Sequence, residues 1–118
     1  MKLITKAIEA KLRQNGVASA EAIQVDGNTP DHTPVMKLFT PWGASTWLIK
    51  EMDEDGDTLF GLCDLGMGCP AMGPVSLAEL RDLKVPFGLR IERDLHWSSD
   101  EPLTVHAARA REVARIVA

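Results

Sequence analysis

The sequence has little of several features that mark specialised classes of protein. It contains two cysteines, three phenylalanines, three tryptophans and no tyrosine, and no apolar run approaches the roughly 20 residues of a membrane span. Cys63 and Cys69 have five residues between them, a spacing that fits neither a zinc knuckle nor a redox pair. We therefore expect two free thiols and no membrane segment.

The start of the sequence also lacks the pattern of a secretory signal. Charged residues at Glu9, Lys11 and Arg13 stand where an apolar stretch and a small-residue cleavage site would be needed. A cytoplasmic location is therefore expected, and cytosolic thiols stay reduced. The apolar fraction of 45% and the charged fraction of 25% exclude a disordered or collagen-like chain. The length of 118 residues fits a single domain spanning 1–118.

Charge is distributed unevenly along a chain whose net charge is -4. Residues 51–64 carry six acidic side chains and no basic one: Glu51, Asp53, Glu54, Asp55, Asp57 and Asp64. Residues 102–118 instead carry three arginines, Arg109, Arg111 and Arg115, and one glutamate. These arginines, with His106, are candidates for phosphate contacts. In an acidic protein a solvated helix face is the stronger expectation, so no nucleic-acid partner is predicted.

Local patterns predict an α+β fold, beginning with a helix over 5–15. Thr5 is its expected N-cap and Gly16 its left-handed stop. Residues 17–34 hold prolines, a glycine and few large apolar side chains, which predicts a long surface connection.

Three strands are predicted next, over 35–40, 45–50 and 58–63, from their β-branched and aromatic content. Turn residues at 41–43 and 53–57 join them into an antiparallel meander. The segment 66–74 holds three glycines and two prolines, which predicts a shaped loop without a regular ladder.

The C-terminal half adds two helices and a strand. Ser76 and Glu79 form a capping box that starts a helix ending before Pro86. Alternation over 89–92 predicts a fourth strand, and apolar residues at three- to four-residue spacing predict a final helix, namely Leu103, Ala107, Ala110, Ala114 and Val117. The result is an antiparallel sheet of about four strands, with an N-terminal helix, a central capping-box helix and a C-terminal helix.

The segment 90–97 concentrates groups that acid–base chemistry would use. In an extended chain Glu92, Asp94 and His96 share one face, so that a carboxylate could orient the imidazole, and Trp97 or Trp42 would wall the pocket. The alternative is structural: Ile91, Leu95 and Trp97 pack while Arg93 pairs with a nearby carboxylate. We favour the structural reading because no nucleophile or phosphate cradle accompanies the cluster.

Two metal sites are conceivable on residue type. Glu51, Asp53, Asp55 and Gly56 match the first, third, fifth and sixth positions of a calcium loop, but its twelfth position is Leu62. A zinc site would need Cys63, Cys69, Asp64 and either His32 or His96, and no spacing selects these donors. The sequence therefore predicts no metal site and no cofactor.

Several segments together resemble a family of small bacterial proteins classified only as a domain of unknown function. They are Phe39-Thr40-Pro41, Trp47, Leu59-Phe60-Gly61-Leu62, the stretch from Val75 to Leu80, Gly88-Leu89 and the heptapeptide from Ile91 to Trp97. The likeness runs from about residue 2 to 105. It implies accessory cargo of plasmids, phages and integrated mobile elements, with no reaction attached.

Taken with the charge pattern, the resemblance favours an interaction role over catalysis. The expected function is that of a non-enzymatic cytoplasmic protein of a mobile element, acting in host-defence evasion or element maintenance. Its expected contact is an acidic hairpin, built from Glu51, Asp53, Glu54, Asp55 and Asp57, that binds a basic protein partner. The alternative is a small enzyme or ligand-binding protein that uses Glu92, Asp94 and His96.

Overall fold

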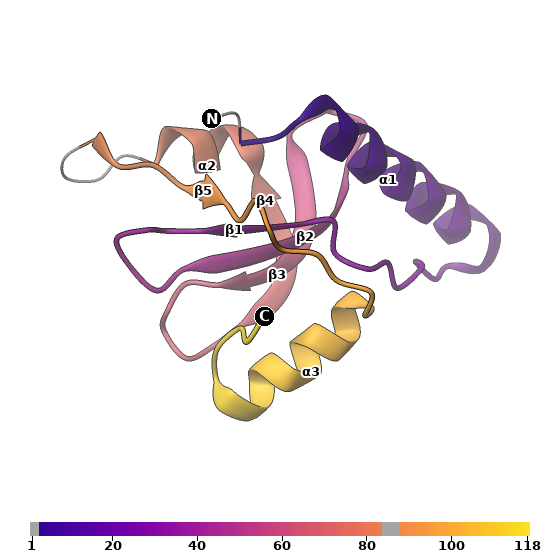
Figure 1. Ribbon diagram of the computed structural model, residues 1–118. Coiled ribbons are helices and arrows are strands. Elements are labelled where there is room, and N and C mark those ends of the chain that lie inside the picture. Colours follow the sequence, from indigo (N-terminus) through magenta and orange to yellow (C-terminus); the bar gives the residue numbers. More distant parts are fainter. Residues whose placement is uncertain (1–2, 84–87) are drawn as a thin grey trace.

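Helices and an antiparallel sheet make up the described part of the chain, residues 3–83 and 88–118 of a computed structural model (Figure 1). In chain order the elements are α1 (Lys6–Asp26), β1 (Met36–Phe39), β2 (Thr46–Met52), β3 (Thr58–Asp64), β4 (Ala71–Ser76), α2 (Leu77–Asp82), β5 (Glu92–Arg93) and α3 (Leu103–Val113). The strand order is β4-β3-β2-β1-β5, with every pair antiparallel. The α+β prediction is confirmed, with five strands where about four were expected.

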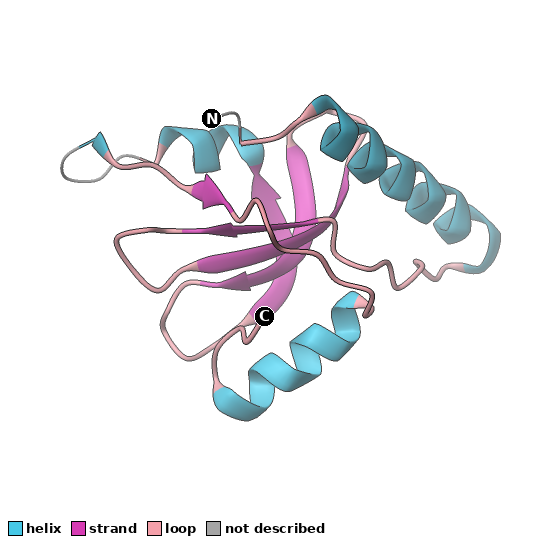
Figure 2. Ribbon diagram, in the orientation of Figure 1, coloured by secondary structure: helices cyan, strands magenta, loops and turns pink. Residues whose placement is uncertain are grey.

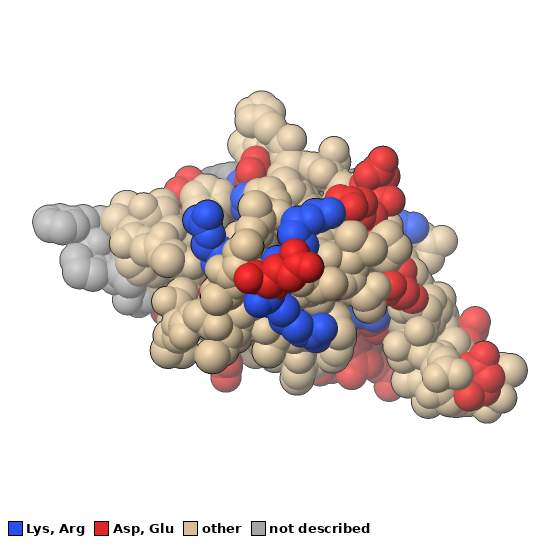
Figure 3. All heavy atoms as spheres, turned by 90° about the horizontal axis from the view of Figure 1, so that it is seen from below, with Lys and Arg blue, Asp and Glu red and all other residues tan. Residues whose placement is uncertain are grey.

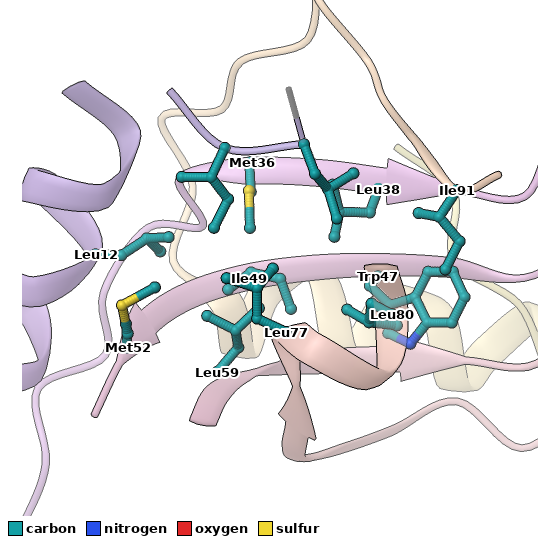
Figure 4. Close-up of a cluster of buried hydrophobic side chains, with 12 residues drawn as sticks. Leu12, Met36, Leu38, Trp47, Ile49, Met52, Leu59, Leu77, Leu80 and Ile91 are labelled. Atoms are coloured by element: carbon teal, nitrogen blue, oxygen red, sulfur yellow. The ribbon is translucent and has the colours of Figure 1, made fainter. Parts of the chain in front are cut away.

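The helices lie on both sides of the sheet (Figure 2). On one side, α1 and α2 enclose the larger apolar cluster, to which Trp47 and Ile49 of β2 contribute (Figure 4). On the other side, Leu48 of β2 packs with Leu62 and with Leu103 of α3. Neighbouring residues of β2 thus serve opposite faces, as strand geometry requires. Trp47 is buried.

Helix α1 continues well beyond its predicted end at 15, because Gly16 is not a stop. Gly16 lies where α1 crosses β2, and a Cβ added there would come within 2.0 Å of the Met52 carbonyl oxygen. Because Gly16 has no side chain, the backbones of α1 and β2 can approach each other closely here. The helix ends instead at Gly27, which has φ 77° and donates its N–H to the Ile23 carbonyl, the usual left-handed cap. The predicted surface connection therefore begins after residue 26.

The predicted meander is confirmed, whereas the loop expected over 66–74 is wrong in its second half. There, β4 pairs in register with β3, and Pro74 lies opposite Phe60. Proline removes a ladder donor, which is tolerated on an edge strand. Because β4 ends the sheet order, its outer side needs no such donor.

The capping box at the start of α2 is confirmed through Ser76 and reinforced from the β2–β3 turn. Ser76 Oγ accepts the Glu79 N–H at 3.2 Å and donates to Asp57 Oδ2 at 2.7 Å. Asp57 Oδ1 accepts the Ala78 N–H at 2.8 Å. Asp57 therefore holds two elements together. The predicted end of this helix at Pro86 lies outside the described residues.

Removing the Ser76 hydroxyl should have a smaller effect than removing the Asp57 carboxylate. Ser76→Ala should lower the free energy of unfolding by about 1 kcal/mol, the usual loss for an N-cap. Asp57→Ala should lower it by about 2 kcal/mol, because two hydrogen bonds to a carboxylate are lost. Urea melts of both variants measure the difference, and a larger loss for Ser76→Ala would contradict this account of α2.

The C-terminal elements are confirmed in kind but are shorter than predicted. Strand β5 pairs with β1 over two residues, and Leu89 is exposed outside it. Helix α3 ends at Ala114, which has φ 61°, before Val117. Its start is fixed from a distant loop, where the Asp31 carboxylate accepts the N–H and hydroxyl of Thr104.

Candidate functional site

Three of the predicted partner-binding acids lie together on the β2–β3 turn. Asp53, Glu54 and Asp55 are all exposed. Asp53 Oδ1 accepts the Glu54 N–H at 2.8 Å, and Asp55 Oδ1 accepts the N–H groups of Asp57 and Thr58, each at 2.8 Å. These bonds fix the turn backbone while the carboxylates face solvent. We call Asp53, Glu54 and Asp55 the acidic turn.

The other acids of the predicted hairpin surface point elsewhere. Asp57 caps α2, as described above, and Glu51 is largely buried against α1. Asp64 is buried too, and its carboxylate accepts the N–H groups of Gly66 and Ile116. The run of six acids along the sequence therefore becomes a group of three in space.

A basic side chain from α1 reaches the acidic turn, although the acidic run itself contains none. A Cβ added to Gly56 would lie 2.8 Å from an Nη atom of Arg13, and Arg13 also pairs with Glu9 at 3.4 Å. The hydroxyl of Thr58 donates to Asp55 and, together with the turn N–H groups and Arg13, lowers the pKa of that carboxyl. Asp55 therefore stays ionised at neutral pH.

A buried ion pair, which the sequence analysis missed, lies where β2 meets α1. Lys50 Nζ is 3.1 Å from Glu51 Oε1, with side-chain exposures of 8% and 16%. Adjacent strand residues normally face opposite sides. Here the pairing with β3 shifts between Ile49 and Glu51, and such a bulge redirects a side chain. The visible signal was a lysine directly following the apolar Trp47-Leu48-Ile49.

Polar groups from α1 and the following loop complete this ion pair. Ser19 Oγ donates to Glu51 Oε1 at 2.9 Å, and Lys50 Nζ donates to the Pro30 carbonyl at 3.3 Å. His32 Nδ1 lies 4.0 Å from Glu51 Oε1, too far for a hydrogen bond. The Lys50 ammonium also lies 5.2 Å from the centre of the Phe60 ring. We call Lys50, Glu51 and Ser19 the buried polar cluster.

The alternative acid–base group of Glu92, Asp94 and His96 lies mostly on the surface. Glu92 and His96 are exposed. Asp94 Oδ1 accepts the His96 backbone N–H at 3.0 Å, so this carboxylate shapes a turn. Three cavities of the described residues, lined in part by Ile4, Ser19 and Ile116 respectively, include none of these three side chains.

The structural reading of the same segment is mostly supported by the placement of its side chains. Ile91 is buried, and Trp97 packs against the α3 cluster. Arg93 donates to the Leu3 backbone carbonyl at 2.6 Å, and its pairing with a carboxylate stays a prediction. The expected packing of Leu95 is wrong, because this side chain is 62% exposed. Trp42, proposed as a pocket wall, packs partly buried against the larger apolar cluster.

The four candidate phosphate-binding side chains, on α3 and just after it, differ in exposure and in their partners. Arg111 and Arg115 are exposed, whereas Arg109 pairs with Glu101 at 2.8 Å. His106 does not join them: it is 6% exposed, and its Nε2 lies 2.8 Å from Ser99 Oγ. Seen from the α3 side, basic and acidic side chains lie next to one another (Figure 3). Nucleic-acid binding gains no support from this mixed face.

Two histidines should make stability fall as the pH drops. Burial is the main cause that lowers the pKa of His106 and of His32. The unfolded chain therefore binds these protons at a higher pH than the folded chain does. Their contribution to the free energy of unfolding is complete above about pH 6.5 and decreases below it. Melts between pH 7 and pH 5 should show this loss, and His32→Gln/His106→Gln should reduce it. An unchanged slope in that variant would contradict the assignment.

The cysteines are free, as expected, and differ in environment. Cys69 is exposed, and Cys63 is half-buried with its thiol pKa raised by burial. Within residues 3–83 and 88–118, no three side chains of the histidine, cysteine, aspartate or glutamate type are grouped so as to hold a metal ion. The donors considered for calcium and zinc are therefore not brought together there.

The comparisons with known proteins extend the resemblance found in the sequence. No helix in the described residues has the length and apolar character needed to cross a membrane. No curated protein and no solved structure matches the chain. A family model does match, over residues 3–117, so the common region includes the arginine-bearing tail and does not end near 105. The chain belongs to the family described as Protein of unknown function (DUF2958).

Proposed function

We propose that this protein is a non-enzymatic interaction module whose acidic turn binds a basic protein partner. The observation that carries the proposal is the exposure of three consecutive carboxylates, Asp53, Glu54 and Asp55, on one turn. Exposed charges of one sign attract an oppositely charged surface and raise the rate of encounter.

The rigidity of the acidic turn supports the same proposal. Asp55 accepts hydrogen bonds from two backbone N–H groups and from the Thr58 hydroxyl. Asp57, next to the turn, is tied to α2. A surface that is already ordered loses less conformational entropy when it binds than a flexible loop would. The turn therefore offers its charges in a fixed arrangement.

Charge neutralisation that preserves the turn tests this function. Asp53→Asn/Glu54→Gln removes two charges, and the side-chain amide oxygen introduced at position 53 can still accept the N–H of the following residue. Asp100→Asn/Glu112→Gln removes the same charge from exposed positions elsewhere. A synthetic ten-residue peptide of alternating lysine and arginine is the probe, and amide shifts of labelled protein report binding at low and at high salt.

The expected result is salt-sensitive binding of this peptide at the acidic turn. Shifts should concentrate on residues 53–58, and the turn variant should bind several-fold more weakly than the control variant, since each exposed charge contributes up to about 1 kcal/mol. Equal affinities of the two variants, or shifts spread over the surface, would show that only the net charge of the protein matters.

A further inference from the structure

A cavity of about 310 Å³ lies next to the buried polar cluster, between α1 and the adjoining parts of β2 and β3. Its volume is at the lower end of the range of about 300–1,000 Å³ found for small-molecule sites. Ala20 and Ile23 of α1 and Phe60 of β3 give it apolar walls, and Lys50, Glu51 and Asp53 bring charges to it. Apolar and charged residues thus both line this cavity.

The charges of this cavity favour a cation. The charged residues that line it are Lys50, Glu51 and Asp53, whose charges sum to one net negative charge. Lys50 is already engaged by Glu51 and by the Pro30 carbonyl. Glu51 Oε1 accepts a hydrogen bond from the Ser19 hydroxyl and pairs with the Lys50 ammonium. Within the described residues, Oε2 of Glu51 accepts no hydrogen bond. The open hydrogen-bonding capacity is therefore that of acceptors.

The way in which the fold encloses Lys50 and Glu51 distinguishes this cavity from a chance group of acidic side chains on the surface. Lys50 is more than nine-tenths buried, and burying an ammonium is costly unless it is paired. The bulge in β2 places this residue and Glu51 together, and Gly16 lets α1 approach closely enough to enclose them. Ile23 lines the cavity although it is largely exposed, so apolar surface remains there for a ligand to cover.

We infer that this cavity binds a small primary amine, whose ammonium group lies against Glu51 and Asp53 and whose apolar part lies against Ile23 and Phe60. A protonated amine supplies the donors that the open carboxylate oxygens accept, and it neutralises the net negative charge. A carboxylate ligand would add a third negative charge. The site is independent of partner binding at the acidic turn, apart from sharing Asp53.

The experiment uses n-butylammonium chloride as the probe, with sodium butyrate and n-butanol as charge controls. Amide shifts of the labelled full-length chain should saturate with butylammonium at Ser19, Ala20, Asp53, Thr58 and Phe60. Ala20→Leu should abolish the response by filling the cavity, whereas Ala10→Leu, at an exposed position of the same helix outside the cavity, should keep it. Asp53→Asn should weaken binding about fivefold, the equivalent of about 1 kcal/mol for one exposed charge.

The proposal is overturned by any of three results. These are the absence of a saturable shift with butylammonium, an equal response to butyrate or butanol, and an unchanged response in Ala20→Leu. Ala20 lies outside the acidic turn, so a loss in this variant concerns the cavity alone. Conversely, failure of the basic peptide to bind leaves the amine titration intact.

Discussion

Replacing Gly16 by alanine should lower the free energy of unfolding by about 3 kcal/mol, the upper end of what overpacking usually costs. In most helices the same substitution stabilises by up to about 1 kcal/mol, because glycine is a poor helix former. Here the new Cβ would come within 2.0 Å of the Met52 carbonyl oxygen. Since the position of a Cβ is fixed by the backbone of α1 and the carbonyl belongs to the backbone of β2, the two elements must move apart.

Gly27→Ala is the matched comparison, since it makes the same change at the end of the same helix. Nothing lies within 4 Å of a Cβ at this position, but its φ is 77°, so the variant should lose only about 1 kcal/mol through backbone strain. Urea melts of both variants measure the difference. A Gly16→Ala protein that is as stable as the original would show that α1 does not cross β2 this closely.

Gly16 also shows why one helix boundary was mispredicted. In sequence, a glycine after ten residues of helical pattern has the features of a C-cap, and so does Gly27 after a longer pattern. In the structure Gly16 lies inside the helix against Met52, whereas Gly27 has φ 77° and open space around it. That contact is between residues far apart in the chain, and local patterns carry no information about it.

Elements whose determinants are local were predicted well. The meander depends on turn residues and β-branched runs, and the start of α2 depends on Ser76. Strand β4 was missed because glycine and proline disfavour a strand in general. Pro74 is tolerated because this strand lies at the edge of the sheet, and that position is a property of the assembled sheet.

The acidic run shows the same limit for the candidate site. The six acids were grouped because they are close in sequence. In a strand or a turn, however, neighbouring side chains point in different directions. Glu51 turns toward Ser19, and Asp57 turns toward α2. Only the acidic turn remains exposed as a group. The pairing of Glu51 with Lys50 follows from a bulge in β2. The sequence of residues 46–52 does not predict this bulge.

Removing either partner of the Lys50–Glu51 pair should be far more harmful than removing both. Glu51→Met leaves an ammonium whose side chain is 8% exposed without its carboxylate, and loss of one partner from a buried pair costs about 3–5 kcal/mol. Lys50→Met leaves the carboxylate with Ser19 as a donor and should lose about 2 kcal/mol, because the Glu51 side chain retains more exposure.

The double variant Lys50→Met/Glu51→Met should lose less than about 1 kcal/mol, since apolar replacement of a whole buried pair is often neutral. Methionine keeps the length of both side chains and adapts to irregular space. Urea melts of the four proteins form a double-mutant cycle, and these losses give an expected coupling of at least about 4 kcal/mol. Additive losses would mean that the two charges do not stabilise each other. The inferred preference of the neighbouring cavity for a cation would then lose its basis, because that preference assumes that Glu51 neutralises Lys50.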